Sequence, residues 1–197
     1  MMNPLRIHLA LAALVVGGCG TVAYDYSKEH DPRKSEFVLG AADALKITVW
    51  KNPEMSSDAR IRPDGTITMP LIGDLKAAGR TPGQLREDIS KRLSAFVKDE
   101  TSTVTVAVTE VNSYRFTVSG NVERGGILSA KYYVTVAEAL AMAGGLNKFA
   151  VGTVTLIRSA DGNGPARRIP IDYRRITSGE HPDENLVLVS GDTLFIP

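Results

Sequence analysis

Alternating apolar and polar residues predict two strands in the first half of the chain. Leu45, Ile47 and Val49 occupy every other position, which is the period of a strand with one buried face. Valines recur at every other position over 103–109 in the same way. We expect both segments to be strands of a first module, which the second of them closes.

A turn sequence separates segments 60–62 and 66–69. It reads Pro63-Asp64-Gly65, in which proline fixes φ, aspartate can bond its neighbours' backbone and glycine tolerates a positive φ. This arrangement predicts a hairpin.

A helical period begins after residue 81. Thr81 is suited to cap the first turn, and Pro82 is suited to the first helical position. The apolar residues that follow predict an amphipathic helix of about four turns, and they are Leu85, Ile89, Leu93 and Phe96.

The pattern changes near residue 113 and predicts a second module. Its helix covers 136–142 and stops at Gly144-Gly145, as a glycine C-cap would stop it. The sequence of residues 161–164 predicts a tight turn. Strands are predicted over 114–119, 153–157, 168–171, 186–189 and 193–196.

These elements predict an α+β protein with two small modules, over 36–112 and 113–197. Segments that begin at Asp43 and Asp192 both read Asp-x-Leu-x-Ile after a nearby glycine. The match is too short to indicate a repeat. It predicts two strands that are each entered through an Asx-type turn.

The first residues have the layout of a bacterial signal peptide. A basic start is followed by an apolar run over 9–16 and by Gly17, Gly18 and Cys19. An apolar run of this length forms about 12 Å of helix, whereas a spanning helix must cross about 30 Å of hydrocarbon. We therefore expect residues 1–18 to be removed.

The Val-Gly-Gly-Cys string at 16–19 resembles the lipobox of bacterial lipoproteins. The resemblance implies that Cys19 becomes the first mature residue and carries acyl chains such as palmitate, which bind a protein to a membrane. Gly20 follows in place of aspartate, which implies sorting to the outer membrane. The alternative is a cysteine that merely follows an ordinary signal sequence. Residues 19–35 show no apolar period and predict a lipidated tether.

Charge and composition exclude several functions. The chain has 23 basic and 22 acidic side chains, so it offers no basic field for nucleic acid. Its single cysteine allows no internal disulfide. The histidines, His8, His30 and His181, are too few for a catalytic triad or a structural zinc site. We expect no catalytic residue, no metal and no cofactor.

Carboxylates are the remaining candidates for chemistry, because a pair of them could hydrolyse a glycoside. Each stands beside glycine or proline or at a strand edge, where a role in a turn is the simpler interpretation. These carboxylates are Asp43, Asp64, Asp172, Asp183 and Asp192.

Trp50, the one tryptophan, falls on the polar side of its strand. It could cover the helix, meet a neighbouring subunit or form a ligand platform. Ordinary packing is the favoured interpretation.

Several spaced motifs together resemble the outer-membrane polysaccharide export family. Segments 37–50, 62–67, 69–73 and 78–82 resemble its polysaccharide export domain. Later segments resemble a soluble-ligand-binding β-grasp (SLBB) domain, and they are 118–122, 125–126, 136–146 and 190–197. The residues that carry the motifs, to which the resemblance gives structural roles, are Gly40, Asp43, Trp50, Pro63, Asp64, Gly65, Pro70, Gly73, Gly79, Gly120, Gly144, Gly145, Gly191 and Asp192. One departure is Ala41-Ala42, where the family commonly has Pro-Gly.

The resemblance implies an export protein without enzymatic activity, made as a lipoprotein on the periplasmic face of the outer membrane. Long members continue into a second SLBB domain and a pore-forming helix, and this chain stops at Pro197. The resemblance therefore implies a short form that assembles a homo-oligomeric ring, guides capsule or exopolysaccharide, and needs a separate outer-membrane pore. An inner-membrane co-polymerase, often with a tyrosine kinase, is the expected partner below it. The rival functions are a monomeric saccharide-binding adaptor or sensor and a glycan-cleaving envelope enzyme.

Overall fold

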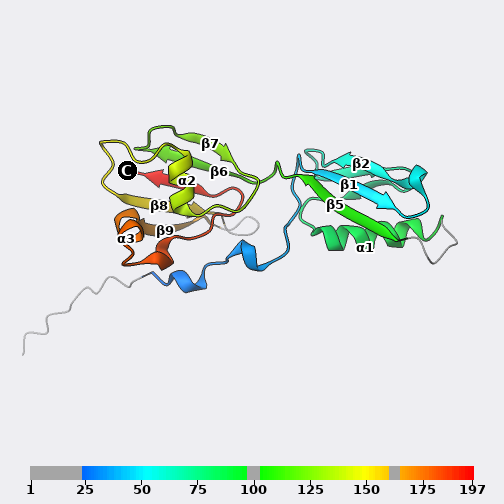
Figure 1. The fold of residues 1–197 in the computed structure, drawn as a ribbon, viewed down its shortest axis with the longest axis horizontal. Helices are drawn as coiled ribbons and strands as arrows, with labels where there is room; N and C mark the ends of the chain where they lie inside the picture. The colour runs from blue at the N-terminus through cyan, green and yellow to red at the C-terminus, as the bar shows by residue number, and fades with distance from the viewer. Residues whose placement is uncertain (1–23, 97–102, 160–164) are drawn as a thin grey trace, which may run out of the picture.

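The structure is a computed structural model that describes residues 24–96, 103–159 and 165–197. These residues form two domains placed end to end, so the molecule is elongated (Figure 1). The chain crosses to the first domain near residue 36 and returns to the second near residue 112. The fold is α+β, as the sequence predicts.

The first domain contains a three-stranded antiparallel sheet of order β2-β1-β5, a two-stranded ribbon of β3 and β4, and one helix. The alternating side chains of the middle strand that the sequence predicts to be buried, Leu45, Ile47 and Val49, are at most 2% exposed. The elements are β1 (Ala44–Val49), β2 (Ser57–Arg60), β3 (Thr66–Met69), β4 (Gly73–Lys76), α1 (Pro82–Leu93) and β5 (Val104–Glu110).

The helix α1 begins as predicted but is shorter than expected. Thr81 and Gln84 form a reciprocal capping box at its start, which satisfies two free backbone donors. The helix ends at Leu93, and Phe96 lies beyond it with 55% of its surface exposed. Placing Phe96 on the buried face was therefore wrong, because the apolar spacing continues past the point where the helix stops.

The turn at 63–65 forms, but the two strands beside it do not pair as a hairpin. Gly65 N–H donates to the Arg62 carbonyl, and Arg62 N–H donates to the Thr66 carbonyl. However, β2 pairs with β1, whereas β3 pairs with β4. Ile61 N–H still bonds the Asp43 carbonyl beside β1, so the chain leaves the first sheet only after that residue.

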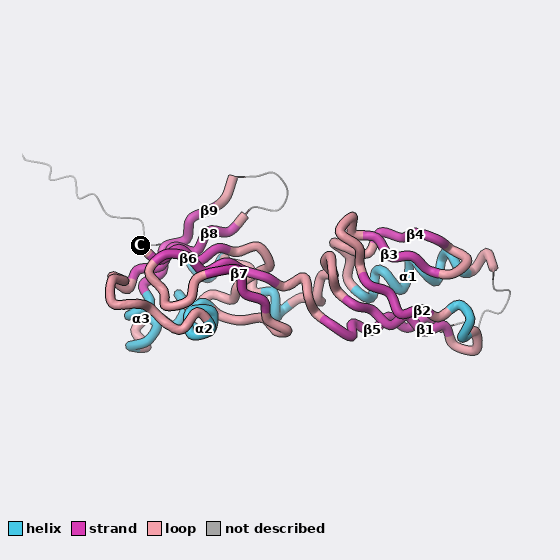
Figure 2. The backbone as a smooth tube through the Cα atoms, turned by 90° about the horizontal axis from the view of Figure 1, so that it is seen from above, coloured by secondary structure: helices cyan, strands magenta, loops and turns pink. Residues whose placement is uncertain are grey.

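The second domain is a five-stranded sheet of order β7-β6-β10-β8-β9, in which only the β10–β6 pair is parallel. The helix α2 has the predicted bounds and packs its buried residues into the domain core. Figure 2 shows α2 and α3 together on one side of the sheet. The elements are β6 (Arg115–Gly120), β7 (Gly126–Ser129), α2 (Val136–Met142), β8 (Thr153–Arg158), β9 (Arg167–Asp172), α3 (Tyr173–Ser178) and β10 (Thr193–Ile196).

One predicted strand of this domain, 186–189, is not a strand. The segment has a single isolated bridge, between Val187 and Thr135, and it bonds the chain ahead of α2 through Leu188 N–H and the Val134 carbonyl. Its apolar residues fill the core without entering the sheet, which explains the strand-like pattern. The turn predicted at 161–164 lies outside the described residues.

Residues 24–35, here called the N-terminal segment, lie along the second domain (Figure 1). The Glu29 carboxylate, 2% exposed, forms ion pairs of 3.1 Å with Arg158 and 2.8 Å with Arg167. The Tyr26 hydroxyl donates to the Pro170 carbonyl over 2.6 Å. The segment is therefore more than the plain spacer that the sequence predicts. Because single side chains make these contacts, the segment has no apolar periodicity from which its packing could be predicted.

The described residues also contain four short 3-10 helices, two of them in the N-terminal segment. They are Tyr26–Lys28, Pro32–Lys34, Pro53–Met55 and Pro182–Glu184.

Candidate functional site at the junction of the two domains

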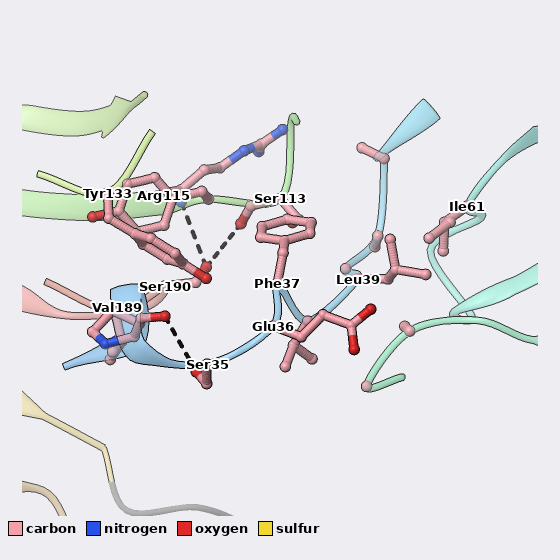
Figure 3. Close-up of a pocket in the computed structure, with 18 of the residues that line it drawn as sticks. Ser35, Glu36, Phe37, Leu39, Ile61, Ser113, Arg115, Tyr133, Val189 and Ser190 are labelled. Atoms are coloured by element: carbon pink, nitrogen blue, oxygen red, sulfur yellow. Dashed lines mark hydrogen bonds between the residues drawn. The ribbon is translucent and has the colours of Figure 1, made fainter. Parts of the chain in front are cut away.

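A cleft of about 1100 Å³ lies where the chain crosses between the domains. The crossing segment 35–42 forms its floor, and both domains supply walls. Figure 3 shows Leu39 and Ile61 on the side of the first domain and Tyr133, Val189 and Ser190 on the side of the second. Clefts between domains are common ligand sites, so we describe this junction in detail.

Asp43 fixes the junction from inside the protein. Its side chain is fully buried, and its carboxylate accepts hydrogen bonds from the backbone N–H groups of Gly40, Asn112 and Ser113 over 2.7–2.9 Å. The Ser113 hydroxyl adds a fourth bond of 2.8 Å. Bonds to an ionised acceptor are stronger than neutral ones. One carboxylate thus joins the two crossings of the chain.

Gly40 and Ala42, within the three residues before Asp43, shape the turn at the junction. A Cβ atom on Gly40 would overlap the Ser113 side chain, so only glycine fits there. Ala42 has a φ of 75°, a left-handed conformation that disfavours alanine. This is the position where the family commonly has glycine, and the turn nevertheless forms.

Asp192 forms a closely similar turn on the other side of the cleft. Its carboxylate accepts the Val189 N–H over 2.9 Å, and Gly191 before it has a φ of 89°. Arg158 is its charged partner, at 2.7 Å from Nη2 to Oδ2. Both side chains are buried. Asp43 and Asp192 are thus turn residues, but not of the predicted Asx type, because each carboxylate accepts the N–H of the residue three positions earlier instead of two positions later. Neither points into the cleft as a free acid.

Arg158 links this turn to the N-terminal segment. Burial opposes its charge, but hydrogen bonds to Asp192 and the nearby carboxylates of Asp192 and Glu29 raise its pKa. Its Nη2 also donates to the Val187 carbonyl over 2.9 Å. Arg158 was not singled out in the sequence. The sequence does contain a sign of its role. If the predicted strand over 153–157 is extended by one residue, Arg158 falls on its buried face, where a charged side chain requires partners.

Aromatic side chains form the wall between the cleft and a second groove of about 500 Å³. Tyr114 and Tyr133 meet edge to face with 5.3 Å between ring centroids, and Phe37 lies 6.5 Å from Tyr133. The Tyr114 hydroxyl donates to the Leu188 carbonyl over 3.1 Å, and burial raises its pKa. Phe37 and Tyr133 are partly exposed, whereas Tyr114 is buried behind them.

Three polar side chains of the cleft are held by hydrogen bonds to the backbone. The Ser190 hydroxyl donates to the Ser113 carbonyl over 2.8 Å (Figure 3), and Glu36 accepts the Gly83 N–H over 3.0 Å. Arg115 Nε donates to the Asn112 carbonyl over 3.1 Å. Among residues 24–96, 103–159 and 165–197, no group of three or more His, Cys, Asp or Glu side chains could hold a metal.

The motif residues separate into three locations. At or beside the cleft lie Gly40, Asp43, Pro63, Gly79, Gly191 and Asp192. Elsewhere in the first domain, Asp64 and Gly65 lie in the turn before β3, and Trp50 follows β1. Pro70 and Gly73 lie at the β3–β4 connection. Turns at the end of β6 and after α2 contain Gly120, Gly144 and Gly145, all with positive φ. Cys19 lies outside the described residues.

Trp50 does not cover the helix. It is 63% exposed at the end of β1, so ordinary packing does not explain it. Asp64 accepts the Thr66 N–H over 3.0 Å, and Asp172 accepts the Arg174 N–H over 3.0 Å. Both are turn or cap residues, as predicted.

Comparison with known proteins identifies both domains. Residues 31–108 match the family described as polysaccharide biosynthesis/export protein, and residues 115–170 match the SLBB domain. The exopolysaccharide production protein ExoF of Rhizobium meliloti (strain 1021) is 30% identical over 129 residues, which cover 59% of this chain and 30% of ExoF. The EPS I polysaccharide export outer membrane protein EpsA of Ralstonia solanacearum is 30% identical over 139 residues, 58% of this chain and 36% of EpsA.

The matched region thus spans about a third of the length of these curated relatives, 30% of ExoF and 36% of EpsA. None of the helices in the described part of the chain is long and apolar enough to cross a membrane.

Proposed function

Because the chain belongs to the polysaccharide export family and carries an export domain followed by an SLBB domain, we propose that it is an envelope lipoprotein of a polysaccharide export machine. Members of this family are export proteins and not enzymes. In our proposal, copies of the chain assemble a closed ring whose lumen guides capsule or exopolysaccharide across the periplasm. The polymer is driven by its synthesis at the inner membrane.

The observation that carries this proposal is the fixed junction between the domains. A closed ring requires every subunit to meet its neighbour at the same angle. A flexible linker between the domains would let that angle vary from subunit to subunit. Asp43 replaces such a linker with four partly buried hydrogen bonds that tie residue 40 to residues 112 and 113. The two domains can then act as one unit in an assembly.

Lipidation at Cys19 and location at the periplasmic face of the outer membrane belong to the same proposal. Their support is the lipobox-like string at 16–19 and the similarity to EpsA, which is named an outer membrane protein. The proposed partners are other copies of the chain, the polysaccharide, an inner-membrane co-polymerase that often carries a tyrosine kinase, and an outer-membrane pore component.

A second candidate function is a monomeric saccharide-binding adaptor. The cleft favours it, because Phe37 and Tyr133 place aromatic rings beside the hydroxyl of Ser190 and the guanidinium of Arg115. Saturable binding of an oligosaccharide by a monomer would support this candidate over the ring.

The deciding experiment compares surface polysaccharide with polysaccharide retained in the cell. A strain that lacks the protein is complemented with the natural chain, with Cys19→Ala or with Asp43→Asn, and protein levels are matched by immunoblot. We expect the natural chain to restore surface polymer and Cys19→Ala to restore little of it. Unchanged surface polymer in the deletion strain would exclude an export role.

The ring is tested separately by the mass of the detergent-extracted protein. We expect an oligomer of defined mass for the natural chain and a broader distribution for Asp43→Asn. A lipidated protein that stays monomeric at high concentration contradicts the ring and favours the adaptor.

A further inference from the structure

The N-terminal segment gives the molecule a second chain crossing between the domains. It lies along the second domain as far as the junction (Figure 1). From Glu36 onward the chain is bonded to the first domain, because the Glu36 carboxylate accepts the Gly83 N–H at the start of α1 over 3.0 Å. The chain returns to the second domain at 112–113. If the segment were undocked, that return would be the one crossing left.

Side chains hold the segment to the second domain. The Glu29 carboxylate pairs with Arg158 of β8 at 3.1 Å and with Arg167 of β9 at 2.8 Å. The Tyr26 hydroxyl donates to the Pro170 carbonyl of β9 over 2.6 Å. Among the described residues, each backbone hydrogen bond of the segment joins two of its own residues. Undocking therefore breaks no backbone pairing with the second domain.

The charges allow the segment to leave without stranding a buried cation. Arg158 keeps its contact of 2.7 Å with Asp192 when Glu29 departs. Arg167 is already 54% exposed, and the Glu29 carboxylate returns to water. Breaking a buried ion pair usually leaves one charge uncompensated. Here the buried pair of the second domain is complete without the segment, which suits a reversible attachment.

The docked segment also forms one side of the cleft at the junction. Its residues His30, Pro32 and Ser35 line the cleft. The cleft floor, 35–42, continues directly from the segment. A movement of the segment would therefore change the width of the cleft.

Asp43 and the segment constrain the two domains in different ways. The bonds of Asp43 all lie where the chain crosses, at Gly40 and at 112–113, so they form a pivot. Domains of one chain move relative to each other unless a large interface holds them. The segment is attached to β8 and β9, and Asp43 forms no hydrogen bond to either strand. A second attachment away from a pivot prevents rotation about it.

We propose that the N-terminal segment is a releasable strap, which locks the angle between the domains and closes one side of the cleft while Glu29 is docked. When the strap leaves, the domains turn about the Asp43 junction and the cleft widens. Closure and opening about a few hinge residues is a common way in which two-domain proteins admit ligands. The proposal does not depend on export, on a ring or on a lipid at Cys19.

The angle can be followed as the distance between two spin labels, because the chain has a single cysteine to remove. Full chains that all carry Cys19→Ser receive Glu87→Cys on α1 and Thr177→Cys on α3, two exposed positions. Pulsed dipolar electron paramagnetic resonance then gives the distribution of label distances. We expect Glu29→Gln to widen this distribution about twofold, as for domains that are free to turn. Hydrogen exchange over 24–35 should rise in the same variant.

Lys28→Gln is the matched control. It replaces a neighbouring charge with the same amide, but Lys28 pairs with Asp25 on the surface of the segment itself. Both the distance distribution and the exchange over 24–35 should equal those of the parent chain. Circular dichroism confirms that each variant keeps its secondary structure.

Two results would overturn the proposal. One is fast exchange over 24–35 with an unchanged distance distribution, because the segment would then leave without freeing the domains. The other is a distribution in the parent chain as wide as that of Glu29→Gln. If Glu29→Gln leaves the segment docked, Glu29→Arg replaces it and sets three cations together with Arg158 and Arg167. A narrow distribution in that variant also contradicts the strap.

Discussion

The turns at 40–43 and 189–192 share one backbone design but serve different connections. In each, the aspartate carboxylate accepts the N–H of the residue three positions earlier, and a residue of positive φ precedes the aspartate. Asp43 bonds only neutral donors across the domain junction, whereas Asp192 bonds the cation of Arg158. The same turn thus joins the domains at one site and, through Arg158, holds the N-terminal segment at the other.

This difference predicts that removing a partner of Asp43 and removing the partner of Asp192 reduce stability by unequal amounts. A carboxylate bound by backbone N–H groups loses little if one side-chain donor is lost. A buried carboxylate that depends on one cation loses its main compensation together with that cation. The following variants test this contrast, from the largest expected effect to the smallest.

Arg158→Met should have the largest effect on stability. It leaves both Asp192 and Glu29 buried without their shared cation, which should lower the free energy of unfolding by about 3–5 kcal/mol. Urea denaturation monitored by circular dichroism measures it. The control is Arg167→Met, whose side chain is 54% exposed and should cost less than about 1 kcal/mol. Equal losses in both variants would falsify the dependence of the second turn on a buried cation.

Asp43→Asn should have the next largest effect and should act at the junction. The amide presents an N–H₂ group to a site that contains backbone donors, so we expect a loss of about 1–3 kcal/mol. Hydrogen exchange should accelerate over 36–43 and 111–114 more than in either sheet. Asp64→Asn, in an exposed turn, serves as the control and should leave exchange at the junction unchanged. A uniform acceleration across both domains would instead indicate general destabilisation.

Exchanging the residues before the two aspartates should give effects of opposite sign. Ala42 and Gly191 have φ values of 75° and 89°, and a Cβ on Gly191 meets no atom within 4 Å. Relief of backbone strain in Ala42→Gly should stabilise the protein by about 0.5–1 kcal/mol, and Gly191→Ala should destabilise it by about the same amount. Thermal unfolding midpoints measure both, and shifts of the same sign would refute the equivalence of the turns.

Glu29 should give the smallest effect, which acid should reveal. Burial opposes its charge, but the Tyr24 hydroxyl and the guanidinium groups of Arg167 and Arg158 together lower its pKa below the usual 4.5. A lowered folded-state pKa stabilises the attached segment above pH 4.5, and this contribution disappears as pH falls through the folded-state value. We expect hydrogen exchange over 24–35 to rise in that range before the domains unfold. Glu29→Gln should show fast exchange over 24–35 at neutral pH already.

The sequence predicts best those elements whose period and boundary signals coincide. The helix over 136–142 has an apolar face, a capping threonine and a glycine stop, and its bounds are correct. Strand β10 is likewise correct. Phe96 continues the spacing of α1 beyond its end, and 186–189 is apolar because it fills the core. In those two cases the hydrophobic pattern reports burial or spacing but not hydrogen bonding.

The site is predictable only in its local parts. Turns at 40–43 and 189–192 are indicated by aspartate and nearby glycine in the sequence, but their side-chain bond to the residue three positions earlier is not of the Asx type that the sequence predicts. The bonds from Asp43 to residues 112 and 113, and from Arg158 to Glu29, connect positions 69–70 and 129 residues apart. Nothing in a local pattern encodes such pairs.

The attachment of the N-terminal segment to the second domain limits how far Cys19 can lie from that domain. The described chain begins at Tyr24, and its ring packs against the second domain. Five residue steps separate Tyr24 from Cys19, which is at most about 17 Å of extended chain. A lipid on Cys19 would therefore confine the second domain to a thin layer beside the bilayer. Encounters between copies would then occur in two dimensions, at a far higher effective concentration than free diffusion in solution provides.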